Sequence, residues 1–131
     1  MLLGAHVSIS GSVDKAVDRA KDLGCTTFQI FTRNPRGWAA KPFKKGEVEE
    51  FRRKLEEYGF EIAVAHMPYL PNLATPDKSV YKKSVKSLME ELKRTEMLGL
   101  PYLVLHVGSH LGKGIAGGIK RVAEGINTAF S

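Results

Sequence analysis

Short apolar runs alternate along the chain with stretches in which apolar residues recur at helical spacing. The runs are rich in β-branched and aromatic residues and predict four strands, at residues 2–8, 26–32, 60–66 and 101–107. The periodic stretches predict four helices, at residues 13–23, 48–58, 80–98 and 115–126. Ser12 is the expected N-cap of the first helix, and Gly24, Gly59 and Gly99 are expected to end the first three.

Strict alternation of strand and helix is typical of an α/β protein with a parallel sheet and right-handed crossovers. Two architectures have this pattern: an open doubly wound sheet and a (βα)8 TIM barrel. A complete barrel needs about 250 residues. The 131 residues here hold four βα units and show no linker, so we expect one domain over residues 1–131. A half-barrel leaves two sheet edges open, and we infer a barrel fragment or a half that assembles with a second half.

Charge and cysteine content narrow the class of protein. Lys and Arg outnumber Asp and Glu by 20 to 14, which gives a net charge of +6. This balance is compatible with a polyanionic partner or with an ordinary basic surface. The single cysteine, Cys25, cannot form an internal disulfide, which favours a reducing cytoplasm. No apolar run approaches the roughly 20 residues of a membrane span, and the first residues lack signal-peptide features.

Three of the predicted strands carry a histidine at or near their ends: His6, His66 and His106. The ends of neighbouring parallel strands lie about 4.8 Å apart at one edge of the sheet. His66 and His106 come from successive units and can share a zinc ion; ordinary hydrogen bonding is the alternative for each. No Asp or Glu ends a strand, and a catalytic zinc typically takes three protein ligands. The remaining ligands must therefore come from elsewhere.

Two loops that follow predicted strands have features of nucleic-acid contact. Residues 33–45 contain five basic residues, two aromatic residues and no acid; cations neutralise phosphates, and aromatic planes stack on bases. The alternative is a solvated basic loop with Trp38 folded onto the rim. Residues 67–73 offer Tyr69 and Leu70 as an apolar wedge, with local packing as the alternative. Just beyond, four lysines at residues 78–86 form either a solvated helix face or a phosphate track.

Four ordered motifs together resemble the endonuclease IV family of apurinic/apyrimidinic endonucleases. They are GAHVS (4–8), FTRNPRGW (31–38), HMPYLPNLA (66–74) and LHVGSHLG (105–112). The resemblance runs through all 131 residues and covers the N-terminal half of that family's TIM barrel. It implies DNA repair by hydrolysis of the backbone on the 5′ side of an abasic site in double-stranded DNA.

The resemblance also implies a cluster of three zinc ions in the whole protein. His66 and His106 match two ligands of one zinc, so this chain would hold at most one partial site. His6 and His110 match positions near the cluster and are assigned a supporting role. The bridging carboxylate and all ligands of the other two ions would lie beyond Ser131, so the catalytic carboxylates are not expected in this chain.

The DNA contacts implied by the resemblance lie in the two loops. Arg36 matches an arginine that enters the base stack, and Tyr69 and Leu70 match residues that wedge in from the minor groove. Arg33, Asn34 and Trp38 are predicted to contact DNA beside Arg36. Met67 departs from the family, which commonly has a polar or acidic residue after the first ligand histidine.

Two other functions remain open on the sequence. Metal-dependent sugar isomerases and epimerases use similar barrels with histidines and carboxylates, although such an enzyme does not need a strongly basic second loop. The second alternative is a non-catalytic half-barrel that pairs with itself and binds DNA or a metal weakly without cleaving anything.

Overall fold

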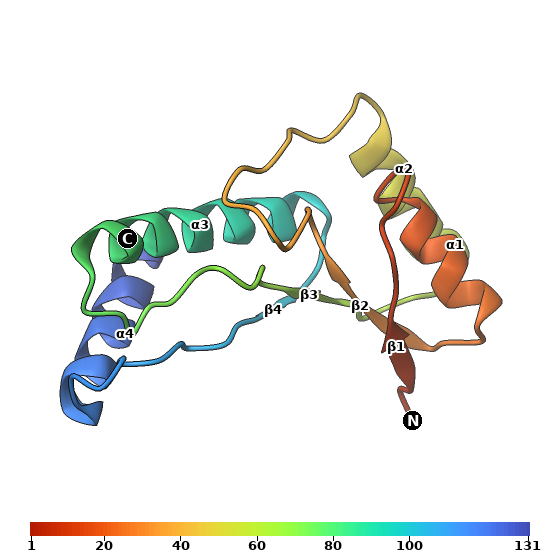
Figure 1. The fold of residues 1–131 in the computed structure, drawn as a ribbon. Coiled ribbons are helices and arrows are strands. Elements are labelled where there is room, and N and C mark those ends of the chain that lie inside the picture. The colour runs from red at the N-terminus through yellow and green to blue at the C-terminus, as the bar shows by residue number, and fades with distance from the viewer.

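The computed structural model describes all 131 residues and shows strands and helices in strict alternation. In chain order they are β1 (Gly4–His6), α1 (Lys15–Asp22), β2 (Thr27–Phe31), α2 (Glu47–Glu57), β3 (Val64–His66), α3 (Lys78–Met97), β4 (Tyr102–Val104) and α4 (Ile115–Phe130). Helices α1 and α2 lie beside one end of the sheet, and α3 and α4 lie beside the other (Figure 1).

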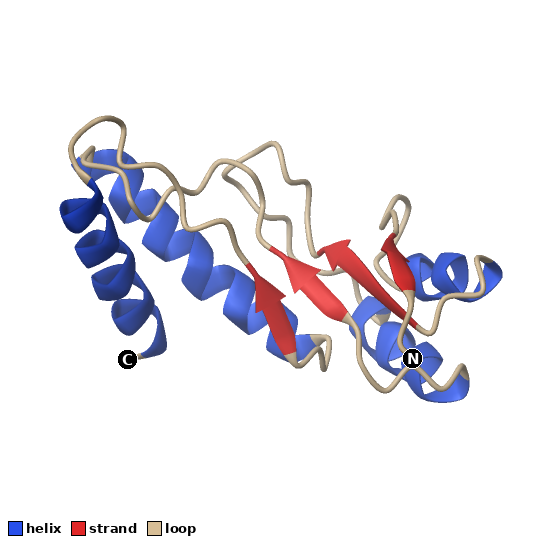
Figure 2. Cartoon of the chain, turned by 90° about the horizontal axis from the view of Figure 1, so that it is seen from below, coloured by secondary structure: helices blue, strands red, loops and turns tan.

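The sheet has the order β1-β2-β3-β4, and each neighbouring pair is parallel. Figure 2 shows the four arrows pointing the same way, with the loops that follow β2, β3 and β4 gathered beyond their tips. A doubly wound sheet reverses its strand order at a switch point, whereas a barrel keeps the chain order. The sheet is therefore the half-barrel that the alternating pattern allowed, and the doubly wound alternative is excluded.

Side-chain alternation along β2 separates the two faces of the sheet. Phe28 and Ile30 are buried and pack against α1 and α2 in the main hydrophobic core, which includes Val17 and Phe51. A smaller core forms where α3 and α4 pack against the other end of the sheet around Leu73, Val85 and Leu88. Thr27, Gln29 and Phe31 face the opposite side of β2, which no helix covers.

The structure corrects several predicted boundaries. Strand β4 ends at Val104, not at Val107, so His106 lies two residues beyond the last paired residue. Strands β1, β3 and β4 each have three residues and are shorter than the predicted strands. Ser12 is not the N-cap of α1; it bonds Asp14, which occupies that position. The glycines expected to end the first three helices are confirmed, because each helix ends two residues before its glycine.

A buried ionic network ties the end of β2 to the middle of α3. Arg33 Nε lies 2.9 Å from Glu91 Oε1, and the two side chains are 2% and 0% exposed. Thr32 Oγ1 donates to Glu91 Oε2 at 2.8 Å and accepts from Arg94 Nε at 3.0 Å. Burial raises the pKa of Glu91, while the Thr32 hydrogen bond and the charges of Arg33 and Arg94 oppose that rise.

The same guanidinium groups hold the loop that follows β2. Arg33 Nη1 donates to the Trp38 carbonyl at 3.2 Å, and Arg94 Nη1 donates to the Lys41 carbonyl at 3.0 Å. The loop backbone is thus fixed at two points by the charged side chains of Arg33 and Arg94.

None of the four helices is both long enough and apolar enough to cross a lipid bilayer.

Replacing Arg33 with methionine is expected to lower the free energy of unfolding by about 3–5 kcal/mol, because Glu91 then stays buried without its charge partner. The loss should grow as the pH rises above the ordinary glutamate range, where the unfolded state ionises and the folded state resists ionisation. Urea unfolding at pH 4 and pH 7 measures both effects.

The matched control is Arg53→Met, since Arg53 pairs with Glu50 and Glu57 on the exposed face of α2. Exposed pairs contribute little, so a change below about 1 kcal/mol is expected there. Adding Glu91→Leu to Arg33→Met should recover much of the lost stability. Equal effects of Arg33→Met and Arg53→Met would contradict the role assigned to the network.

Candidate metal centre and DNA-binding rim

The uncovered face of the sheet places two histidine rings side by side. The pairing register aligns Phe31, His66 and Val104 across β2, β3 and β4. Because side chains alternate between faces, His106, two residues beyond Val104, emerges on the same face as His66. The ring centroids of His66 and His106 lie 5.1 Å apart.

This separation fits a shared metal ion. Two imidazoles bound to one tetrahedral zinc at about 2.0–2.1 Å have ring centroids about 5 Å apart. His66 Nδ1 lies 2.7 Å from the Met67 carbonyl, which can only accept, so this nitrogen carries the proton. Nε2 of His66 is then the nitrogen that remains free to bind a metal, with the ring oriented by the adjacent backbone carbonyl. The orienting group is a carbonyl, so it does not depend on which side chain follows His66.

The chain brings these two candidate ligands together without a third. No group of three or more His, Cys, Asp or Glu side chains in the structure is close enough to hold a metal ion. A catalytic zinc typically takes three protein ligands. The residues described here can therefore form part of a metal centre but not a complete one.

His6 and His110, predicted to support the centre, have other partners. The Phe31 ring lies between His6 and His66, at centroid distances of 4.5 and 5.5 Å. His6 Nδ1 accepts from the Gln29 side-chain amide at 2.9 Å. Burial, and secondarily the charge of His66, lowers the pKa of His6, which favours the neutral ring.

The ring of His110 faces the start of α4. Its Nδ1 accepts from the Gly114 backbone N–H at 3.3 Å, and its Cβ packs closely against Gly118. It makes no hydrogen bond with His66 or His106. A supporting role for His110 at the metal remains a prediction, and its visible contacts are those of a residue that positions the helix.

The loops after β2 and β3 meet at the rim above the histidines. Tyr69 N–H donates to the Pro35 carbonyl at 3.0 Å, and the Tyr69 and Phe31 rings are 5.2 Å apart. Tyr69 remains 64% exposed and Leu70 40% exposed. Both side chains are thus available as the predicted apolar wedge, on a loop held at its base.

Residues of the loop after β2 differ in how exposed their side chains are to a ligand in solvent. Asn34 and Arg36 are exposed, and Asn34 Oδ1 accepts from the Arg36 N–H at 3.0 Å, a turn that presents the arginine outward. Trp38 is half-buried, with Lys83 Nζ 5.7 Å from its ring centroid. Arg33 does not face the solvent at all. Its guanidinium forms a buried salt bridge with Glu91, so the geometry does not support its predicted contact with DNA.

A clamp that the sequence did not reveal joins the loops after β3 and β4. Asn72 Oδ1 accepts from the Ser109 N–H at 3.0 Å, and its Nδ2 donates to the Ser109 carbonyl at 2.9 Å. Gly108 adopts a left-handed φ of 104°, and a Cβ there would lie 1.9 Å from Asn72 Oδ1. The only sequence signal was the pairing of an asparagine and a glycine in adjacent loops. Together they fix the segment that follows His106.

Comparisons with known proteins agree with this geometry. Residues 17–131 match the model of the xylose isomerase-like TIM barrel family. The chain belongs to this family. It is 53% identical to the protein named "Probable endonuclease 4" from Nitrosopumilus maritimus, covering 98% of this chain and 47% of that protein. It is also 53% identical over 130 residues to the protein of the same name from Methanoculleus marisnigri, covering 46% of its length.

Among solved structures, endonuclease IV from Thermus thermophilus has a TM-score of 0.84 and 38% identity, covering 97% of this chain and 46% of that one. The resemblance to endonuclease IV drawn from the four motifs is thereby confirmed. A 3-keto-D-glucoside 4-epimerase from E. coli has a TM-score of 0.68 at 14% identity, which shows the barrel fold alone. The chain spans about half the length of the curated relatives it matches.

Substituting Gly108 with alanine is expected to destabilise the protein by about 1–3 kcal/mol, because the new Cβ needs a strained backbone and collides with Asn72. Asn72→Ala removes solvent-exposed hydrogen bonds and should cost about 1 kcal/mol. Thermal unfolding measures both. Gly112→Ala is the control, since Gly112 also has a positive φ but no neighbour within 4 Å of a Cβ. If Gly108→Ala is no more damaging than Gly112→Ala, the clamp does not have the assigned role.

Proposed function

We propose that this chain supplies the lesion-binding half of a zinc-dependent DNA-repair endonuclease that hydrolyses the phosphodiester 5′ to an abasic site. The observation that carries the proposal is the His66–His106 pair, with ring centroids 5.1 Å apart beneath two exposed DNA-binding loops. Similarity to endonuclease IV proteins over nearly the whole chain supports it. Because the chain spans about half of those relatives, the complete activity belongs to a complete barrel.

Zinc fits the two imidazoles, and His66 Nε2 and the His106 ring would hold it. A bound zinc acts as a Lewis acid and lowers the pKa of a bound water, which supplies hydroxide near neutral pH. The remaining ligands, including the carboxylates, and the other two ions of the proposed cluster are assigned to residues outside this chain. His66 and His106 are the contribution of these 131 residues.

The rim residues explain how an abasic site would be selected. The damaged position has no base to unstack or unpair, so extruding it costs less than flipping an intact nucleotide. Tyr69 and Leu70 would fill the space in the stack, and Arg36, with Asn34 beside it, would enter from the other loop. Inserting exposed apolar side chains also removes them from water, which favours the bent complex.

A complementary half-barrel is the proposed protein partner. Both sheet edges, β1 and β4, have a partner on one side only, and Tyr102 and Val104 on β4 are 58% and 42% exposed. A second half, either from a longer chain or from another copy, would cover them. We expect this assembly, and the DNA it repairs, in the cytoplasm.

The sugar-epimerase alternative is less well supported. The epimerase similarities lie below 20% identity and show the fold alone. A sugar site does not need the exposed cations Arg36, Lys41, Lys44 and Lys45, which lie in the loop after β2, a loop without acidic residues. A polyanionic substrate uses all of them.

The chain is expected to bind a duplex with a tetrahydrofuran abasic site more tightly than the matched undamaged duplex, because only the lesion admits the wedge. Arg36→Ala should weaken lesion binding about tenfold, since it removes a charge-assisted contact. Fluorescence anisotropy measures both. Arg53→Ala, which removes an exposed positive charge from α2, is the control and should change binding less than about twofold.

The same protein sample tests whether this chain alone can cleave DNA or needs the rest of a barrel to do so. With Zn²⁺ added, the 131-residue chain should leave the abasic duplex uncut. Robust cleavage would show that two histidines suffice and would contradict the assignment of carboxylates to residues outside the chain. Equal affinity for damaged and undamaged duplex would contradict lesion recognition itself.

A further inference from the structure

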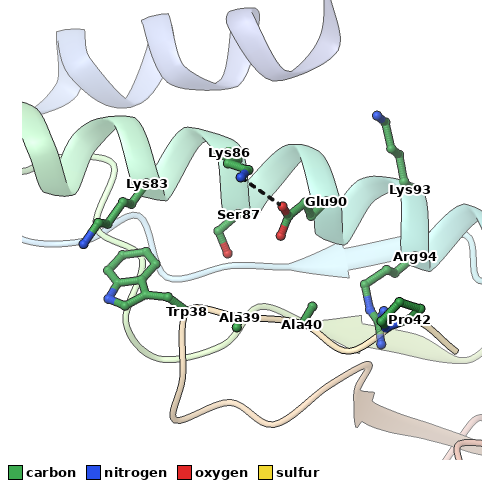
Figure 3. A pocket seen from close by; sticks show the side chains of 10 residues that line it. All are labelled: Trp38, Ala39, Ala40, Pro42, Lys83, Lys86, Ser87, Glu90, Lys93 and Arg94. Atoms are coloured by element: carbon green, nitrogen blue, oxygen red, sulfur yellow. Dashed lines mark ion pairs between the residues drawn. The ribbon is translucent and has the colours of Figure 1, made fainter.

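A groove lies between the loop after β2 and the flank of α3, and neither His66 nor His106 lines it. It has a volume of about 520 Å³ and is walled by Trp38 to Pro42 on one side and by α3 on the other. Figure 3 shows Lys83 reaching from α3 toward Trp38 and Lys86 beside Glu90, whereas the end of the Lys93 side chain points away from the loop segment.

The charge of this groove is strongly positive. Four cations line it, namely Lys83, Lys86, Lys93 and Arg94, against one carboxylate, Glu90. Glu90 is already shared, because its Oε2 lies 3.5 Å from Arg33 Nη1 and its Oε1 lies 3.9 Å from Lys86 Nζ. The three lysines are exposed, and only Lys86 has a carboxylate partner, Glu90, so the charges of Lys83 and Lys93 are available to a ligand.

The wall opposite the lysines is rigid. Hydrogen bonds from Arg33 and Arg94 fix the loop at the Trp38 and Lys41 carbonyls. Arg33 is itself paired with the buried Glu91, and Arg94 donates to Thr32, which in turn donates to Glu91. A ligand would therefore enter a groove whose backbone is already ordered, which lowers the entropic cost of binding. An ordinary solvated lysine face lacks such a wall.

The loop that forms one wall of the groove also carries residues of the rim. Trp38 lies two residues after Arg36 in the loop, and the Pro35 carbonyl accepts from Tyr69 on the wedge loop. At about 1.5 Å of rise per residue, Lys83 and Lys93 are about 15 Å apart along α3. One DNA strand has a phosphate for every 3.4 Å or so of duplex axis, so the row of lysines can face several consecutive phosphates.

We propose that this groove binds backbone phosphates of the DNA that flanks the lesion, with Lys83, Lys86 and Lys93 as the phosphate contacts and Trp38 packed on the same strand. The site extends the DNA footprint beyond the rim, onto the side of the half-barrel. It rests on the proposed function for its choice of DNA as the polyanion, but its prediction concerns the flank and not the lesion.

The test compares two variants that each lose three charges. Lys83→Gln/Lys86→Gln/Lys93→Gln empties the groove of lysines, and Lys15→Gln/Lys21→Gln/Lys120→Gln removes exposed lysines from α1 and α4. Affinities are measured for abasic duplexes of about 10 and about 30 base pairs over a range of salt, since phosphate contacts release counterions. Circular dichroism checks that both variants keep the native helix content.

The groove variant should lose about tenfold in affinity for the long duplex and less than about twofold for the short one, with a salt slope smaller by about two to three. The control variant should change neither by more than about twofold. Equal behaviour of the two variants, or equal loss at both duplex lengths, overturns the groove as a flank site. If the groove variant loses binding to polyglutamate but keeps its binding to DNA, the proposal of a DNA site is also overturned, in favour of an acidic protein partner.

The two proposals fail in different ways. If lesion recognition is wrong, abasic and undamaged duplexes bind alike, yet the length-dependent loss in the groove variant persists on both. If only the groove is wrong, the preference for the lesion and the effect of Arg36→Ala remain, and the lysine substitutions behave like their control.

Discussion

The register between β3 and β4 is the constraint on which the candidate centre depends. Pairing of His66 with Val104, continued by the Met67 N–H to the Val104 carbonyl at 2.8 Å, sets where both histidines emerge. A slip of one residue would turn one imidazole toward the helices, because side chains alternate between faces. The buried Ala65, which faces the core opposite Leu103, makes such a slip costly.

Polar contacts then position the loops that the sheet presents. Arg33 and Glu91 hold the β2 loop from beneath, and Asn72 ties the β3 loop to the β4 loop. Apolar packing alone could not do this, since loops bury little apolar surface. The exposed Tyr69, Leu70 and Arg36 can therefore project into solvent without their backbones losing order.

Much of the fold and part of the site could be predicted from the sequence. Periodicity and glycine positions indicated the βα order, and strand-end positions indicated that His66 and His106 would meet. Arg33 was misinterpreted because a linear stretch of basic residues does not show which one turns inward. Only the tertiary position of Glu91, far along the chain and buried in α3, decides that. Asn72 and Gly108 were missed for the same reason, since each acts through the other.

Nitrogen-15 NMR of the four histidine rings during addition of zinc tests most directly whether His66 and His106 share one ion. Nε2 of His66 and one ring nitrogen of His106 are predicted to shift together, at the same zinc concentration, while Nδ1 of His66 stays protonated and the rings of His6 and His110 do not respond. Independent titration of the two rings, or a response centred on His6 or His110, would contradict a shared metal centre.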